Sequence, residues 1–138
     1  MKARAKLIEG MSFLGEAGSG HSVVMDGSPE SGGRNAGFRP MELLLVGLAG
    51  CTAFDVVLIL RRGREDVADC VVEVSAERAP EDPKVFTKLH LDYHVKGKNL
   101  SDAKVKRAVE LSKEKYCSAS IMLGKTAEIT WAYTVEAL

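Results

Sequence analysis

The fold of this chain is decided by residues 40–62, which read PMELLLVGLAGCTAFDVVLILRR. This is the longest apolar run in the sequence, with Cys51 at its middle, Glu42 near its start and Arg61 and Arg62 at its end. A helix formed by this run would be apolar on nearly every face, and a helix without a wide polar face has to be buried all round. We therefore expect a central helix over 40–62 that the rest of the protein encloses.

A membrane span is the competing interpretation of the same run. Residues 43–60 only reach the lower limit of length for a spanning helix. Asp55 lies within them, and a carboxylate at mid-bilayer costs about 2.5–3.5 kcal/mol on insertion scales. The sequence outside the run alternates like strands or is amphipathic, which is enough to wrap one central helix. We therefore expect no membrane partner.

The composition is that of an ordinary globular protein. The chain has 138 residues, with Lys+Arg 19 and Asp+Glu 19. This length predicts one domain, and the absence of net charge gives no reason to expect nucleic acid as a partner. Three cysteines are present, and no apolar segment follows the basic start MKARAK. Because secretory signals need such a segment and disulfide-stapled domains are secreted, we expect a cytoplasmic protein with free thiols.

Hydropathy alternation and turn residues predict the remaining elements. Their order, βββ–α–ββ–α–β, is that of an α+β fold and not of a parallel βαβ array. We expect a single domain over 1–138 with a β-meander at 1–25, a loop at 26–39, the central helix at 40–62, strands within 67–95, a second helix at 101–116 and a final strand at 126–136.

Cys51 is open to two interpretations. Cysteine is among the most buried residue types, so packing alone could explain it. Gly47 and Gly50 precede it in the predicted helix, where each glycine costs about 1 kcal/mol. These glycines suggest that another group approaches the backbone closely, and they favour a functional thiol.

Cys117 follows the second predicted helix, in SKEKYCSASIML. If residues 118–123 are helical, the helix dipole together with Lys113 and Lys115 should lower the pKa of this thiol. Packing at a helix junction is the alternative. Cys51 and Cys117 can meet only if their helices pack together. Cys70, in contrast, shares a strand face with valines and reads as core.

Other chemical motifs are weak. The sequence has no CxxC, HxxxH or HExxH pattern, no phosphate-binding GxxxxGK[ST] loop and no GxSxG elbow. His90 and His94 lie on a strand face that reads as solvated. Asp55 comes one helical turn after Cys51, where a carboxylate would raise the thiol pKa unless a cation pairs with it. We interpret Asp55 as a buried structural acceptor, and we expect no metal site.

Several stretches of the sequence resemble a known protein family. The run PMELLLVGLAGCTAFDVVLIL, the later EKYCSASIML and a closing strand are similar to the OsmC/Ohr family of thiol peroxidases. The opening MKARAKLIEGMSFLGEAGSGH and the step GHSVVMDG resemble its YhfA-like branch most. The likeness covers essentially the whole chain, and the GCxxxDV core with a distant YCS is fairly specific.

The resemblance implies a fold and a chemistry. The fold would be OsmC-like, with two central helices wrapped by antiparallel sheets in an intertwined homodimer. Cys51 would attack the O–O bond of an organic hydroperoxide or hydrogen peroxide, and Cys117 would resolve the product to a disulfide. A dithiol reductant would restore the pair. No cofactor, neither metal nor flavin, is implied.

The resemblance also implies an arginine and a glutamate that hold the reactive thiolate. Glu42 is the candidate glutamate, although Met41 stands directly after the proline, where the family commonly has its glutamate. The arginine is Arg39 or Arg34. Two other functions fit the same sequence: a non-catalytic dimer that binds a small apolar ligand, and a redox sensor in which the disulfide reports oxidation.

Overall fold

The computed structural model describes all 138 residues. They form two compact units, Met1–Leu45 and Val46–Leu138. The boundary falls within helix α1 (Pro40–Arg62), whose bounds are those predicted from the sequence. The single domain expected over 1–138 stays a prediction.

The first unit is built on a three-stranded antiparallel meander. Its strands are β1 (Ala3–Glu9), β2 (Ser12–Ala17) and β3 (Ser22–Met25), in the order β1-β2-β3. The predicted β-meander is confirmed. Gly10, at the tip of the first hairpin, has a φ of 56°, a value that glycine adopts without steric cost.

One buried carboxylate organises the loop at residues 26–39. Asp26 accepts the Ser12 hydroxyl at 2.8 Å and the backbone N–H groups of Gly27, Arg34 and Ala36 at 2.7, 3.3 and 3.2 Å. The hydrogen bond from Ser12, followed by those from the backbone, holds the pKa of Asp26 below its usual value. A short 3₁₀ turn, η1 (Pro29–Ser31), lies within the same loop.

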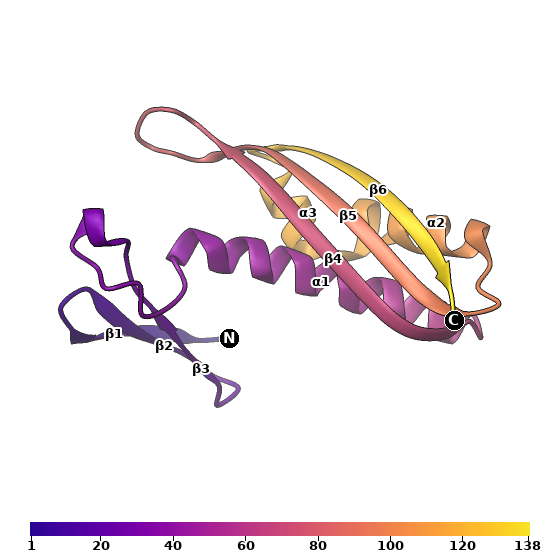
Figure 1. The fold of residues 1–138 in the computed structure, drawn as a ribbon, viewed down its shortest axis with the longest axis horizontal. Coiled ribbons are helices and arrows are strands. Elements are labelled where there is room, and N and C mark those ends of the chain that lie inside the picture. Colours follow the sequence, from indigo (N-terminus) through magenta and orange to yellow (C-terminus); the bar gives the residue numbers. More distant parts are fainter. The chain divides into compact units, whose positions relative to one another are not determined.

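The second unit places helices on one face of a second sheet (Figure 1). Its strands are β4 (Asp66–Arg78), β5 (Phe86–Lys98) and β6 (Glu128–Ala137), in the order β4-β5-β6. Strands β4 and β5 are antiparallel as predicted, whereas β5 and β6 are parallel. The expectation of purely antiparallel sheets is therefore wrong, because the helical connection after β5 returns the chain to the end where β5 began.

That connection comprises three helical pieces: α2 (Asp102–Leu111), the π-helical turn η2 (Ser112–Tyr116) and α3 (Ser118–Leu123). The hydroxyl of Ser101 caps α2 by accepting the Lys104 N–H at 3.3 Å, which is the usual role of serine at this position. The predicted helix at 101–116 is thus α-helical only to Leu111. Single π-turns of this kind are frequent at functional sites.

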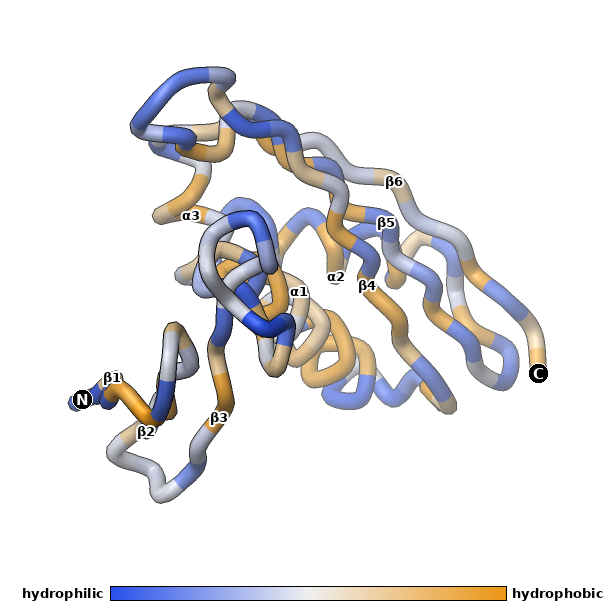
Figure 2. The backbone as a smooth tube through the Cα atoms, turned by 60° about the vertical axis from the view of Figure 1, so that its left-hand side comes forward, coloured by the Kyte–Doolittle hydropathy of each residue, from blue (hydrophilic) through white to orange (hydrophobic).

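Helix α1 is apolar over most of its length (Figure 2), yet it buries one stripe only. Leu48, Thr52, Val56 and Leu60 are buried and recur every four residues, which is the spacing of a single helix face. Phe54, in contrast, is 71% exposed. Burial on all sides, as expected from the sequence, is therefore not found within one chain. By length and composition α1 could cross a membrane, but core helices of soluble proteins pass the same test.

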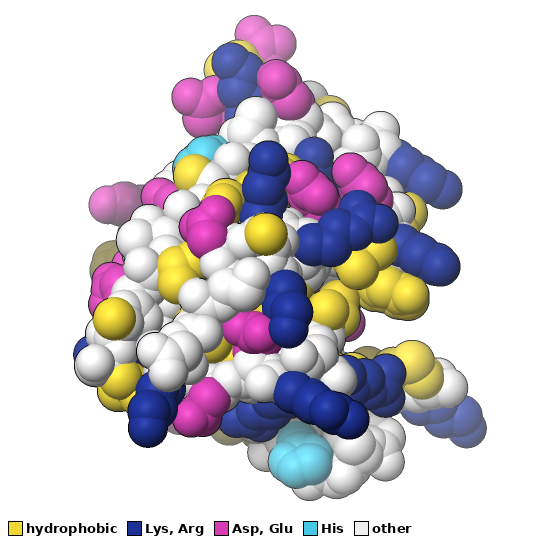
Figure 3. Space-filling view, turned by 90° about the vertical axis from the view of Figure 1, so that its right-hand side faces the viewer, with side chains coloured by type: hydrophobic (Ala, Val, Ile, Leu, Met, Phe, Trp, Pro, Cys, Tyr) yellow, Lys and Arg dark blue, Asp and Glu magenta, His cyan; other side chains and the backbone are white.

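Alternate residues along β5 contribute to the core of the second unit. Leu89, Leu91, Tyr93 and Val95 are all 1% exposed or less. Val105, Ala108 and Val109 of α2 are also fully buried. Side chains on the surface drawn in Figure 3 are of both charges with apolar groups between them, in keeping with a chain of no net charge.

Candidate functional site

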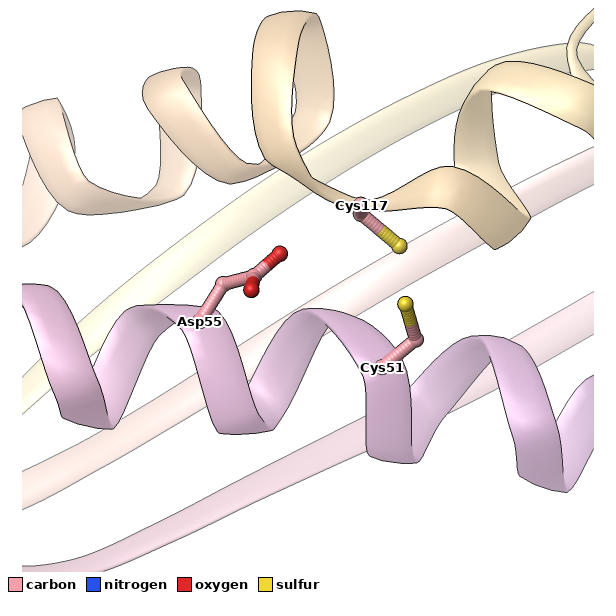
Figure 4. Close-up of side chains that lie close together, drawn as sticks. All are labelled: Cys51, Asp55 and Cys117. Atoms are coloured by element: carbon pink, nitrogen blue, oxygen red, sulfur yellow. The ribbon is translucent and has the colours of Figure 1, made fainter.

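Two cysteines and one aspartate meet between α1 and the break that follows η2. Cys51 and Asp55 lie one turn apart on α1, and Cys117 lies between η2 and α3 (Figure 4). One donor atom from each, the two sulfurs and a carboxylate oxygen, all lie within 4.8 Å of one another. The structure therefore brings together the two thiols that the sequence singled out. All three cysteines of the chain are free thiols.

The local backbone explains the position of Cys117. The π-helical turn ends there, and Cys117 adopts an extended conformation with φ −76° and ψ 99°. Its sulfur then accepts the N–H of Ser120 at 3.3 Å and so caps α3. The predicted helix start at residue 118 is confirmed.

The expected lowering of the Cys117 pKa is wrong. The side chain is fully buried, and burial is the main cause that raises the pKa of this thiol, with the neighbouring Cys51 adding to it. Hydrogen bonds from Ser120 oppose the rise without overcoming it. The effect of burial on the pKa of the thiol is therefore larger than the opposite effect expected from the N-terminus of one short helix.

A chain of buried hydroxyls leads to Asp55. Thr52 on α1 contacts the hydroxyls of Tyr93 and Ser112, both at 2.7 Å, and Ser112 donates to Asp55 Oδ2 at 3.0 Å. A hydroxyl carries one hydrogen. Because Ser112 uses its hydrogen to donate to Asp55, Thr52 must donate to Ser112, and Tyr93 must donate to Thr52. Every hydrogen bond of this relay then points toward the carboxylate, as the sequence-based interpretation of Asp55 as an acceptor requires.

The relay crosses three elements of the second unit. Tyr93 comes from β5, Thr52 from α1 and Ser112 from η2. Burial raises the pKa of Tyr93 to about 12, with the hydrogen bond to Thr52 opposing it. Sequence reasoning missed all three residues as part of the site. The available signal was that Thr52 and Ser112 are hydroxyls at positions facing the core.

An apolar cavity of about 320 Å³ adjoins the cluster and shares Asp55 with it. Helix α1 and the end of α2 with η2 form its walls. Its other lining residues are Leu58, Ile59, Arg62, Leu111 and Tyr116. The volume is at the lower end of the range typical for small-molecule sites.

Arg39 and Glu42 lie in the first unit, at the start of α1. Glu42 accepts the backbone N–H of Arg39 at 2.7 Å, which is the reach of a capping-box carboxylate back to the residue before the helix. The Arg39 guanidinium donates to Asn35 Oδ1 at 2.9 Å and makes no ion pair. Arg34 is 3.4 Å from a carboxylate oxygen of Glu9. The structure thus brings Arg39 and Glu42 to one another, and their role toward Cys51 stays a prediction.

Cys70 lies outside the cluster, half-buried on β4. Burial, aided by the nearby Asp69, raises the pKa of its thiol. Its placement agrees with the packing role expected from the sequence.

These features define a class: an α+β protein whose helices lie on one face of a mixed sheet and carry a thiol pair at their contact. A family profile described as OsmC-like protein matches residues 32–132. The chain belongs to the OsmC-like family.

Individual relatives agree with this assignment. The chain is 50% identical to Protein YhfA of Escherichia coli K12 over 137 residues, covering 99% of both chains. An OsmC-like protein from Mycoplasma pneumoniae superposes with a TM-score of 0.82 at 18% identity, covering 98% of this chain and 96% of its own. An organic hydroperoxide resistance protein from Legionella pneumophila gives 0.69 at 17% identity, covering 97% of both chains. The last two likenesses concern the fold.

Proposed function

We propose that this protein reduces hydroperoxides with Cys51 and Cys117. The observation that carries the proposal is the approach of the two sulfurs within one cluster, inside 4.8 Å. A disulfide needs its sulfurs at about 2.05 Å, so side-chain rotation and a small shift of η2 or α3 can close the pair. The family membership and the hydroperoxide resistance named for the Legionella pneumophila relative support the same chemistry.

The reaction balances in three steps. The Cys51 thiolate attacks the peroxide O–O bond, which breaks, and the leaving alkoxide takes up a proton to become an alcohol; Cys51 is oxidised to a sulfenic acid. The Cys117 sulfur then attacks the Cys51 sulfur, releasing water and forming the disulfide. A dithiol reductant reduces the disulfide by exchange and is itself oxidised. We place Cys51 as the attacking thiol because it is half-buried, whereas Cys117 is fully buried.

The apolar cavity beside Asp55 supports an organic hydroperoxide as substrate. Its aliphatic walls suit a hydrocarbon tail, and Arg62 gives it one cation. The same cavity favours the alternative function, binding of a small apolar ligand without turnover. The two are separated by whether the thiols are consumed.

Arg39 and Glu42 complete the proposal as the pair that activates Cys51. A cation beside a thiol favours its thiolate form. Arg39 is the better candidate of the two arginines, because Arg34 is paired with Glu9, whereas the guanidinium of Arg39 has no carboxylate partner. Glu42 would orient it. Arg39→Lys and Arg39→Ala, compared by the rate of Cys51 oxidation, test this role.

A homodimer in the cytoplasm is part of the same proposal. Val46, Phe54 and Leu58 of α1 are 52%, 71% and 37% exposed. Large apolar patches on a monomer are rare and mark contact surfaces. A second copy is the occupant that the family resemblance implies. The cytoplasm is the compartment that keeps cysteines reduced, and this chain has three free ones.

The test is rapid-mixing oxidation of the reduced protein with a slight excess of cumene hydroperoxide, followed by thiol counting. We expect loss of two of the three thiols within seconds, the same absolute loss in Cys70→Ser, and no loss in Cys51→Ser on that timescale. Thiols that stay intact, or that are lost equally fast in Cys51→Ser, would contradict the proposal. Intact thiols with tight binding of an apolar ligand would favour the binding protein.

A further inference from the structure

We propose that Cys51, Asp55 and Cys117 of the reduced protein form a binding site for Zn²⁺. The two sulfurs and a carboxylate oxygen converge within 4.8 Å from two separate segments (Figure 4). Two thiolates and a carboxylate are a ligand set that zinc uses, with a water completing four-coordination. No sequence motif indicates this site, because the two cysteines are 66 residues apart in the chain.

The distances fit zinc after a modest contraction. Tetrahedral zinc with Zn–S of about 2.3 Å and Zn–O of about 2.1 Å places its ligand atoms roughly 3.6–3.8 Å from one another. The three donor atoms lie within 4.8 Å of one another, so the largest closure required is about an ångström. Side-chain torsions of Cys51 and Asp55, which are half-buried, can supply it.

The surroundings of Asp55 provide an independent argument. Carboxylates that bind metals are themselves held by hydrogen bonds, which fix their orientation. Here Ser112 donates to Oδ2 of Asp55 at 3.0 Å, and Ser112 is itself held at 2.7 Å by Thr52. The relay therefore leaves Oδ1 free of hydrogen bonds from the protein and restrains the carboxylate beside the sulfurs.

Zinc binding involves no change of oxidation state. Each thiol that ligates zinc releases one proton, because the thiolate is the ligand. The disulfide form offers no thiolates, so the site exists only in the reduced protein. Zinc would occupy the lone pairs with which Cys51 attacks peroxide, so hydroperoxide should oxidise the thiols of the zinc-loaded protein more slowly. Conversely, oxidation of Cys51 and Cys117 to the disulfide should prevent zinc binding.

The probe is Co²⁺, which replaces zinc in such sites and absorbs light when bound to thiolate. The reduced full chain is titrated with Co²⁺ and then with Zn²⁺ in competition with a chelator. We expect one cobalt per chain, a thiolate-to-cobalt charge-transfer band, and its loss on addition of Zn²⁺. Asp55→Asn should weaken the affinity by tenfold or more, and Ser112→Ala by about tenfold through the loss of orientation.

Cys70→Ser is the matched control, since it removes a cysteine outside the cluster. The band should persist in Cys70→Ser and vanish in Cys51→Ser and Cys117→Ser. The disulfide form of the unaltered protein tests the site without any substitution: it should bind no cobalt, and reduction should restore binding. Circular dichroism checks that each variant is folded.

Absence of the band in the reduced protein would overturn the inference, as would a band that survives in Cys51→Ser or depends on Cys70. The readout is independent of turnover. A protein that binds zinc but leaves hydroperoxide untouched supports the site and contradicts the peroxidase, and the opposite result does the reverse.

Discussion

The hydroxyl relay beneath the cysteine pair should contribute measurably to stability, and Thr52→Val tests it. The substitution keeps the shape of the side chain but removes the middle of the relay, with its two 2.7 Å hydrogen bonds. Each net hydrogen bond contributes about 0.5–1.5 kcal/mol, and stranding the buried Tyr93 hydroxyl costs about 1–3 kcal/mol. Because these contributions overlap, we expect Thr52→Val to lower the free energy of unfolding by about 2–4 kcal/mol.

Tyr93→Phe gives the matched comparison. It removes only the last donor of the relay, and Thr52 still donates to Ser112, so the expected loss is about 1 kcal/mol. In the double variant with Thr52→Val and Tyr93→Phe, no buried hydroxyl is left without a hydrogen-bond partner. It should therefore be no less stable than Thr52→Val alone, a departure from additivity of about 1 kcal/mol.

The assay is urea unfolding of the reduced variants at a fixed protein concentration. The fluorescence of Trp131, the single tryptophan, reports from β6 in the same unit, and the slope with urea should stay unchanged if only stability is altered. A loss below about 0.5 kcal/mol for Thr52→Val, or losses that add within about 0.3–0.5 kcal/mol, would refute the relay.

Three further predictions concern charge, reactivity and assembly. The pKa of Asp26 is lowered in the folded protein, so Asp26 stabilises the fold above its unfolded-state pKa, and this contribution is lost as the pH falls through its folded-state pKa. Asp26→Asn should therefore make the melting temperature fall less steeply on acidification. An unchanged fall would contradict a stabilising role for the Asp26 carboxylate. The pKa of the Cys117 thiol is raised, so iodoacetamide should alkylate Cys117 only in alkaline solution and more slowly than Cys51. Peptide mapping measures both reactions, and fast labelling of Cys117 at neutral pH would contradict this prediction. Phe54→Glu should shift sedimentation toward the monomer, whereas Val85→Glu, at an apolar residue exposed outside α1, should leave it unchanged; equal behaviour of the two would argue against dimerisation through α1.

The sequence predicted the elements well where hydropathy has a single period. The apolar run predicted α1 with its observed bounds, and hydropathy alternation predicted strands in the region that β4 and β5 occupy. These features are local. Each depends on residues a few positions apart, which is the range over which sequence patterns carry information.

Features that depend on tertiary contacts were not predictable in the same way. The parallel pairing of β5 with β6 follows from the direction in which the helical connection returns. The π-turn η2 interrupts a pattern that reads as continuous helix. The pKa of Cys117 was predicted from neighbouring charges, whereas its burial, which only the fold determines, has the larger effect.

In the site, too, local features were predictable from the sequence and tertiary contacts were not. Cys51 and Cys117 stood out as thiols in unusual local settings, and Asp55 as an acceptor, but nothing in the sequence places Ser112 beside Asp55 or Tyr93 beside Thr52. These contacts join residues 57 and 41 positions apart. The incomplete burial of α1 in one chain is a further example. The apolar residues of α1 predict that the helix is buried, but they do not indicate which other segment or chain covers it.

The proposed function requires that Cys51 and Cys117 of one chain act as a pair. The most direct measurement is mass spectrometry of peptides from the reduced protein after one equivalent of cumene hydroperoxide, without added reductant. We expect a disulfide that joins the Cys51 peptide to the Cys117 peptide, with Cys70 still a thiol. Cys51 found as a sulfinic acid without the disulfide, a disulfide that includes Cys70, or unmodified thiols throughout would contradict it.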